Sequence, residues 1–320
     1  MGERGLGEYL ERAAVIATVR APVSELTLWV NYHLNIGVDH ILLFFDDPDD
    51  EAVEVLASYD QVTAVRCSAE YWSKREEGRH KALGDRQVFN VNEGARMLAS
   101  RGCEWIIHID SDELIHPLGP LKEILRSSKD DAVRFLGLEA VPLNEEYENI
   151  FKPTLFKVMP NRIQMAFARI LCCSRAIFEG EYFRSHTASK MAVRTSAGIK
   201  QYRIHKAIKH EGPLTVTDTK KIQLLHYDCI GFEDWKSKWD KRLGDTGMPP
   251  LMRESRRQQM RSYEAERRKG GQGLALLYDR LYHIPAREKM VLKVLGMLRH
   301  VEIDGRLFNA PHAVAAGPQS

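Results

Sequence analysis

Short apolar runs alternate with helical patterns through the first third of the chain. The runs are rich in β-branched and aromatic residues, which is typical of buried strands. Their ranges are 13–19, 40–45, 62–67 and 105–110. The segments between them carry apolar residues at helical spacing, and we expect helices over about 25–34, 49–58 and 80–100. Strands that alternate with helices predict an α/β fold, in which helices flank a mixed, mostly parallel central sheet.

The pattern changes after residue 130, where predicted strands follow one another with few helices between them. These strands are expected over 132–141, 169–178, 190–195, 203–210 and 221–226. Such crowding favours antiparallel or mixed pairing. A linker signal, Gly247-Met248-Pro249-Pro250, comes later in the chain. We therefore divide the chain into a main domain, residues 1–246, and a C-terminal appendage, residues 247–320, whose patterns are helical.

Composition narrows the class of protein. With 320 residues, of which 44% are hydrophobic, the chain can bury a full core. Its net charge of +2 is too small to indicate a nucleic-acid partner, and its five cysteines are too scattered for a disulfide framework. The N-terminal residues lack the apolar core of a signal peptide, and no apolar stretch reaches the ~20 residues that span a bilayer. These features predict a cytoplasmic protein, with a peripheral contact at the inner face of the membrane left open.

The run 105–110 ends in three acidic residues, Asp110, Asp112 and Glu113. Like charges this close repel one another, and burial increases the cost of each charge. A hard cation such as Mg²⁺ or Mn²⁺ would remove that cost and could also bind phosphate oxygens. On a continuing strand, Asp110 and Asp112 would face the same side, as a D-x-D pair. The alternative is a solvated acidic turn at the end of a strand.

Other polar residues follow the neighbouring strands. Thr18 and Arg20 come at the end of the first strand, and Asp46 and Asp47 come at the end of the second. The carboxyl ends of parallel strands meet at one edge of a sheet, and ligands bind there. We therefore expect these side chains to lie beside the acidic run.

The order of these blocks resembles the GT-A glycosyltransferases of families 2 and 92. In the first half the resemblance rests on Trp29, Tyr32-His33, Gly37-Val38-Asp39-His40, Asp46-Asp47 and the segment 105–114. In the second half it rests on Lys190–Arg194 with a later His205, on Leu225-His226-Tyr227, and on Phe232-Glu233-Asp234-Trp235 with Lys238. The similarity spans residues 13–242. One departure is that the family's Asn-Glu after the first strand is here only Glu25, preceded by Arg20-Ala21-Pro22.

The resemblance implies a GT-A fold with a donor half, 13–120, and an acceptor half, 130–246. It implies a nucleotide-sugar donor, whose base and ribose would lie near the end of the first strand and Asp46. A carboxylate can accept the N3–H of uracil, so Asp46 favours a uridine donor; its alternative role is an N-cap of the next helix. Lys190 and Arg194, four apart, would face one side of a strand and clamp the diphosphate. The implied donor-binding residues are Thr18, Arg20, Glu25, Asp46, Arg86, Gln87, Asp110, Asp112, Lys190 and Arg194.

The resemblance also implies a metal site. Asp110, Asp112 and His226 would hold Mn²⁺ or Mg²⁺, and the imidazole favours Mn²⁺. The alternative for His226 is a core or surface role. Glu113 is expected to have a structural part. The general base that activates the acceptor hydroxyl would be Glu139, Asp228 or Asp234, which the sequence does not rank.

Our leading hypothesis is a metal-dependent, inverting glycosyltransferase. It would move a sugar from a nucleotide diphosphate, with UDP favoured, to a glycan or lipid-linked acceptor in bacterial surface polysaccharide synthesis. One alternative is a sugar-phosphate nucleotidyltransferase, but the segment TVRAPVSE after the first strand has no glycine-rich phosphate loop. The other is a non-catalytic sugar- or nucleotide-binding module. A degraded D-x-D pair would favour such a module, but Asp110 and Asp112 are both present.

Overall fold

A computed structural model describes residues 12–311, except 77, 143–146, 172, 186 and 246–252. The first part of the chain forms β1 Ala13–Val19, α1 Val23–Asn35, β2 His40–Phe45, α2 Ala52–Ala57, β3 Val62–Arg66, α3 Ala69–Trp72, α4 Leu83–Ser100, β4 Trp105–His108, β5 Glu113–Pro117 and α5 Leu121–Arg126. The middle forms β6 Ala132–Ala140, β7 Leu155–Val158, α6 Arg162–Ile170, β8 Met191–Arg194, η1 Thr195–Ala197, β9 Ile199–Tyr202, β10 Ala207–Lys209 and β11 Val216–His226. The last part forms α7 Phe232–Asp245, α8 Glu254–Arg268, α9 Leu274–Tyr282, α10 Ala286–Val294, β12 Leu298–His300 and η2 Gly305–Phe308.

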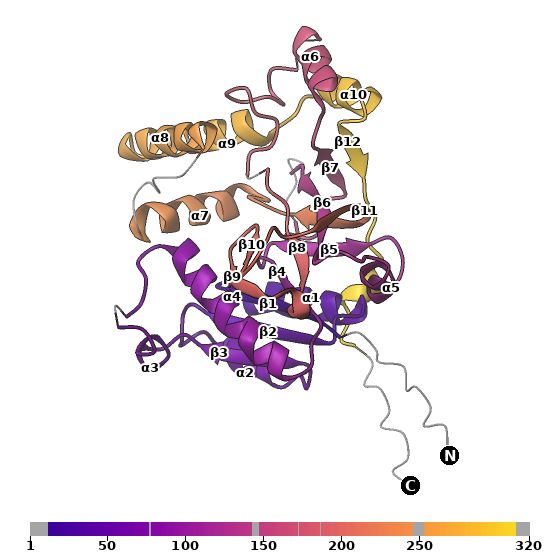
Figure 1. The fold of residues 1–320 in the computed structure, drawn as a ribbon. Helices are drawn as coiled ribbons and strands as arrows, with labels where there is room; N and C mark the ends of the chain where they lie inside the picture. Colours follow the sequence, from indigo (N-terminus) through magenta and orange to yellow (C-terminus); the bar gives the residue numbers. More distant parts are fainter. Residues whose placement is uncertain are drawn as a thin grey trace, which may run out of the picture.

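A mixed sheet flanked by helices organises the described residues, as predicted (Figure 1). Its strands follow the order β12-β7-β6-β8-β4-β1-β2-β3, while β11 pairs with both β6 and β5. The first-half strands β3, β2, β1 and β4 are all parallel. Most of the later pairs are antiparallel, although β11 runs parallel to β6. The carboxyl ends of β1, β2 and β4 therefore share one edge.

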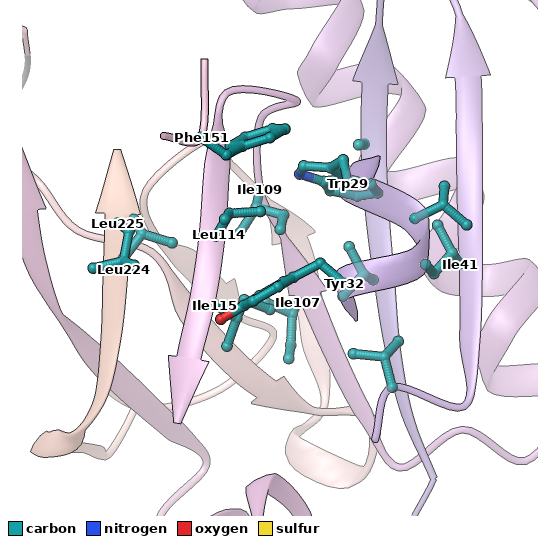
Figure 2. Close-up of a cluster of buried hydrophobic side chains, with 14 of the residues drawn as sticks. Trp29, Tyr32, Ile41, Ile107, Ile109, Leu114, Ile115, Phe151, Leu224 and Leu225 are labelled. Carbon is teal, nitrogen blue, oxygen red and sulfur yellow. The ribbon is translucent and has the colours of Figure 1, made fainter. Parts of the chain in front are cut away.

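Both faces of the parallel strands are buried, because helices cover each side. Along β1, Val15 packs on the side of α1, and Ile16 packs on the side of α4. The α1 side holds the larger core, in which Trp29 and Tyr32 meet residues from β4, β5 and β11 (Figure 2). On the other side α4 approaches closely: a Cβ at Gly94 would lie 2.8 Å from the Leu42 side chain. This close approach fixes α4 against the face of the sheet formed by β1 and β2.

Several local predictions need correction. Residues 169–178 were expected as a strand, but α6, residues 162–170, ends inside this range, and the described residues from 171 to 177 form turns and irregular structure. The helix begins with a capping box, in which Asn161 accepts from the Gln164 backbone N–H and Gln164 accepts from that of Asn161. The expected strand over 203–210 shortens to β10, which pairs with β9 in a separate two-stranded sheet. The strand before the acidic run ends at His108, earlier than expected.

The C-terminal segment is connected to the main sheet. The predicted linker, 247–250, lies outside the described residues. Beyond it the expected helices are present as α8, α9 and α10, but the last pattern also supplies β12, which pairs with β7. Near the end of the described chain, Asn35 of α1 donates hydrogen bonds to the carbonyls of Leu307 and Asn309, each at 2.9 Å. The segment therefore packs against both halves of the chain. Among the described residues, none of the helices combines the length and apolarity needed to cross a membrane.

Candidate metal and nucleotide site

The acidic run forms a turn between β4 and β5. The Glu113 backbone N–H donates to the Asp110 carbonyl at 3.1 Å, and the Asp110 N–H donates to Glu113 Oε2 at 2.8 Å. Asp110 and Asp112 therefore lie in a tight turn, where a continuing strand was expected. The Asp112 carbonyl accepts from the Tyr227 N–H at 2.8 Å, which holds the turn against the end of β11.

Three potential metal ligands meet at this point. One ligand atom from each of Asp112, His226 and Asp228 lies within 4.8 Å of the other two. His226 Nε2 is 3.7 Å from Asp112 Oδ1. Two carboxylates and an imidazole are suitable ligands for a divalent cation, and the imidazole favours Mn²⁺ over Mg²⁺. The structure thus unites Asp112 and His226, as predicted, and adds Asp228, which was predicted as a general base.

Asp110 lies beside this trio and has different partners. Its carboxylate accepts from Gln87 Nε2 at 2.6 Å and from Lys190 Nζ at 2.9 Å. Burial disfavours the charged form of Asp110, but the Lys190 ammonium outweighs burial and holds the pKa of the carboxyl well below its usual range. Lys190 also lies 3.5 Å from Glu113 Oε2. Glu113 is fully buried, and burial raises its pKa to about 7, in keeping with a structural place inside the turn.

Positive side chains surround the metal ligands. Lys238 Nζ on α7 lies 3.1 Å from Asp112 Oδ2, 3.8 Å from Asp228 Oδ1 and 3.2 Å from Asp234 Oδ2. Arg256 Nη2 on α8 donates to Asp228 Oδ2 at 3.1 Å. Burial alone would raise the pKa of Asp112 and of Asp228, yet these cations hold both well below the usual range. The carboxylates are therefore charged at neutral pH.

A hydrogen-bonded relay lies behind His226. Ser185 Oγ donates to Glu139 Oε2 at 2.7 Å, and His226 Nδ1 lies 3.1 Å from the same Oγ. Because the serine proton points to Glu139, the hydroxyl oxygen is free to accept from Nδ1–H. Burial lowers the pKa of His226, but the Asp112 carboxylate outweighs burial and raises it to about 9, so the ring also carries a proton on Nε2 at neutral pH. A cation bound by Asp112 would displace that proton, while Ser185 keeps the other proton on Nδ1 and so presents Nε2 as the ligand.

Glu139 itself is fully engaged. It accepts from Lys157 Nζ at 2.9 Å and from the backbone N–H groups of Arg184 and Ser185. Burial would raise the pKa of Glu139, but Lys157 and these hydrogen bonds lower it to about 2. A carboxyl group so acidic is a poor proton acceptor at neutral pH.

A cavity of about 590 Å³ lies at the carboxyl ends of β1 and β2. Arg20, Asp46, Trp72 and Arg79 are among the residues that line it. Asp46 accepts two hydrogen bonds from the buried Arg86, at 2.7 and 2.8 Å, and one from Arg79 at 3.0 Å. The alternative role of Asp46 as a helix N-cap is wrong, because α2 begins at Ala52.

Of the remaining predicted donor-binding residues, Thr18 and Glu25 lie near the site, whereas Arg194 does not. Thr18 accepts from Asn90 Nδ2 at 3.0 Å beneath the cavity. Glu25, in the first turn of α1, lies near the metal ligands: burial raises its pKa, and the charge of Asp234 adds to this effect. Arg194, however, is not brought to the site. It pairs with Trp105 at the opposite end of β4, forms an ion pair with Glu104 and lies over the Trp105 ring at 4.1 Å.

Sequence reasoning missed several residues of the site. Lys238 entered the sequence analysis only through the family resemblance and was given no role in the site, although its i,i+4 spacing from Asp234 was a usable signal. No sequence motif marks Arg79, Ser185 or Arg256. These residues come to the site only in the folded chain.

These observations define an α/β protein with a nucleotide-sized cavity beside an acidic, metal-compatible turn. The chain belongs to glycosyltransferase family 92, whose family model matches residues 16–262. Two glycosyltransferase-like proteins of Arabidopsis thaliana are 22% and 23% identical over 259 and 256 residues, which is 72% of this chain in each case. Those matches span 56% and 49% of the relatives, so the chain covers about half the length of the curated relatives it matches.

The chain also matches two solved structures over most of its length. Residues 1–349 of S. aureus TarS match with a TM-score of 0.34 and 13% identity, covering 89% of this chain and 78% of that one. The same fragment in complex with UDP matches with a TM-score of 0.33 and 14% identity, covering 87% and 77%. With TM-scores this low, the assignment rests on the family model.

Proposed function

We propose that this protein is a metal-dependent glycosyltransferase that uses a nucleotide diphosphate sugar, with UDP as the nucleotide. The observation that carries the proposal is the meeting of Asp112, His226 and Asp228 at the sheet edge that also bears the 590 Å³ cavity. The acceptor would be a hydroxyl of a glycan or lipid-linked molecule of a bacterial surface polysaccharide, and transfer would invert the anomeric centre.

The cavity would hold the base and ribose. A carboxylate offers about four lone-pair sites, and Asp46 uses three for Arg86 and Arg79. One site therefore remains for the N3–H of uracil, which supports a uridine donor. Arg86 orients the carboxylate, and it is itself too buried to bind the donor directly.

The diphosphate would lie between the cavity and the three metal ligands. A bound Mn²⁺ or Mg²⁺ would stabilise the charge of the departing diphosphate. Lys190 is fully buried against Asp110 and sets the charge of the turn. Lys238 is partly exposed and lies among three carboxylates, so it can shift towards a phosphate oxygen when a cation takes its place.

Among the predicted candidates for the general base, Asp234 is favoured. Burial raises the pKa of Asp234, and its side chain stays 27% accessible to solvent. Asp228 would bind the metal, and the Glu139 carboxylate already accepts hydrogen bonds from Lys157 and Ser185, so neither is available as the base. A base with a raised pKa accepts a proton from an acceptor hydroxyl more readily at neutral pH.

Thermal unfolding tests the donor site. UDP with Mn²⁺ should raise the Tm of the full chain, and Asp112→Asn should abolish that shift. Asp218→Asn, at a carboxylate with 74% exposure outside the site, is the matched control and should keep the shift. A wild-type Tm that no nucleoside diphosphate raises would rule out the proposal.

A second experiment separates the three functional classes. UDP release from a panel of UDP-sugars in the presence of acceptor glycans would identify a transferase. Pyrophosphate release from a nucleoside triphosphate and a sugar phosphate would identify a nucleotidyltransferase. Binding of UDP without release from any UDP-sugar would identify a binding module.

A further inference from the structure

One end of the molecule exposes an unusual concentration of large apolar side chains. It is formed by α6 and α10, which lie together at the top of Figure 1. Among the described residues, seven of the twelve exposed large hydrophobic residues belong to these helices or to their ends. They are Met159, Ile163, Phe167, Ile170, Leu171, Met290 and Val294. Soluble proteins rarely expose so many apolar side chains in one region unless that region contacts a partner. We call this region the α6–α10 end.

The apolar residues lie on the outer faces of packed helices. Ile163, Phe167 and Ile170 follow the i, i+4, i+7 spacing of one helix face, and Ile170 is 72% exposed. The opposite face of α6 is packed: Ala168 is fully buried, and Gln164 Nε2 donates to the Leu295 carbonyl at the end of α10 at 2.8 Å. The exposed side chains are therefore held on a structured scaffold.

The helix α10 has the same division. Met290 and Val294 are four residues apart, and they are 63% and 84% exposed. Leu292 is buried and shares a core cluster with Ala168 of α6. The two helices thus form one packed unit with apolar side chains on its exposed surfaces.

The exposed charges on the helices α6 and α10 are positive. The helix α6 contains no acidic residue, and its Arg162 and Arg169 are exposed. On α10, Arg287 and Lys293 are exposed, whereas the acidic Glu288 is buried. The Glu288 carboxylate accepts from the backbone N–H groups of Arg175 and Ala176, so its charge is not presented to solvent.

We propose that the α6–α10 end is a membrane-docking surface for an anionic phospholipid bilayer. The apolar side chains would enter the boundary between headgroups and acyl chains, and the arginines and lysines would meet lipid phosphates. A second copy of the chain could also cover the apolar side chains, but a symmetric pairing would bring like charges of α6 and α10 together. The positive charge of α6 and α10 therefore favours an anionic lipid surface over a second copy of the chain. This inference does not depend on the proposed function.

Vesicle co-sedimentation tests the proposal with the full chain. We expect binding to phosphatidylcholine vesicles that contain about a third phosphatidylglycerol, weaker binding to pure phosphatidylcholine, and loss of binding at high salt. Ile163→Ser with Phe167→Ser should lower the partition coefficient at least about tenfold. Arg162→Gln with Arg169→Gln should lower it for the anionic vesicles alone.

The matched control is Val55→Ser with Leu118→Ser, two exposed apolar residues away from this end, which should bind as the wild type does. An unchanged Tm would show that each variant is folded. The proposal would be overturned if the wild-type chain does not bind anionic vesicles. It would also be overturned if the variant with Ile163→Ser and Phe167→Ser binds them as strongly as the wild type. A dimer that dissociates in this variant, without vesicle binding, would identify a second copy as the occupant and equally overturn it.

Discussion

The guanidinium of Arg86 donates to both oxygens of the Asp46 carboxylate, through Nε at 2.7 Å and Nη2 at 2.8 Å. Arg86 belongs to α4, and Asp46 follows β2, so this pair joins a helix to the edge of the sheet. Both side chains are nearly inaccessible to solvent. The pair therefore fixes the Asp46 carboxylate in the wall of the cavity.

Arg86→Met should be strongly destabilising, because it leaves the buried Asp46 carboxylate with only the partly exposed Arg79. We expect a loss of about 3–5 kcal/mol in the free energy of unfolding, measured by urea denaturation. Arg96→Met is the control: Arg96 pairs with Glu93 at the surface, and its loss should cost less than about 1 kcal/mol. Equal losses in the two variants would contradict this role of Arg86.

Ser185→Ala should weaken Mn²⁺ binding without removing a ligand. Nδ1 of His226 would lose its hydrogen-bond partner, so the tautomer that presents Nε2 would be less favoured. We expect the Mn²⁺ concentration for half-maximal activity to rise about 10–100-fold, with little change in the KM for the donor.

The control for this relay is Ser189→Ala. The Ser189 hydroxyl is buried nearby but has no hydrogen-bond partner among the described residues. An equal effect of both substitutions on Mn²⁺ would show that Ser185 acts only through packing.

Asp234→Asn should remove the proposed general base and keep the proposed donor site. The expected result is a fall in kcat of about 10²–10⁴-fold, with the Tm shift by UDP and Mn²⁺ retained. Glu233→Gln alters the neighbouring acidic residue, which is 80% exposed, and should leave kcat unchanged. Retained kcat in Asp234→Asn would transfer the role to another carboxylate, with Glu25 the first to examine, because its pKa is also raised.

Glu139→Gln should change how stability depends on pH. The pKa of Glu139 falls from 4.5 to about 2 on folding, so ionised Glu139 stabilises the folded chain above about pH 4.5. That contribution, on the order of 3 kcal/mol, is lost as the pH falls from about 4.5 towards 2. The variant should be less stable than the wild type at pH 7, and the difference should shrink across this range.

The control for this pH effect is Glu148→Gln, at a surface carboxylate that is 79% exposed and pairs with Lys152. Urea unfolding of the three proteins at several pH values gives the comparison. A constant difference between Glu139→Gln and the wild type from pH 7 to pH 3 would contradict the low pKa of Glu139.

The parallel half of the fold could be predicted from the sequence because its signals are local. Each strand is a short apolar run, and the carboxyl edge follows from the alternation of strands with helices. That logic placed Asp46, Asp110 and Asp112 correctly at one edge of the sheet. It failed over 169–178, because apolar residues of this segment, such as Cys173 and Ala176, are buried against Leu292 of α10 without forming a strand.

The second half depends on pairings that periodicity does not reveal. Lys190 and Arg194 were expected to act together, but β8 runs antiparallel to β4, so only Lys190 reaches the acidic turn. Asp228 was considered only as a base, since its place beside Asp112 depends on the pairing of β11 with β5. These relations are properties of the assembled sheet.

The charge balance of the acidic turn has a consequence for the order in which the chain is made. Lys190 follows Asp110 by 80 residues, and Lys238 follows Asp112 by 126. The parallel half thus leaves the ribosome with its acidic turn uncompensated, and like charges oppose its closure until the later strands and α7 arrive. Synthesis of the later segments therefore completes the site and relieves this repulsion, so the nascent parallel half gains its final stability from the strands and helix that follow it.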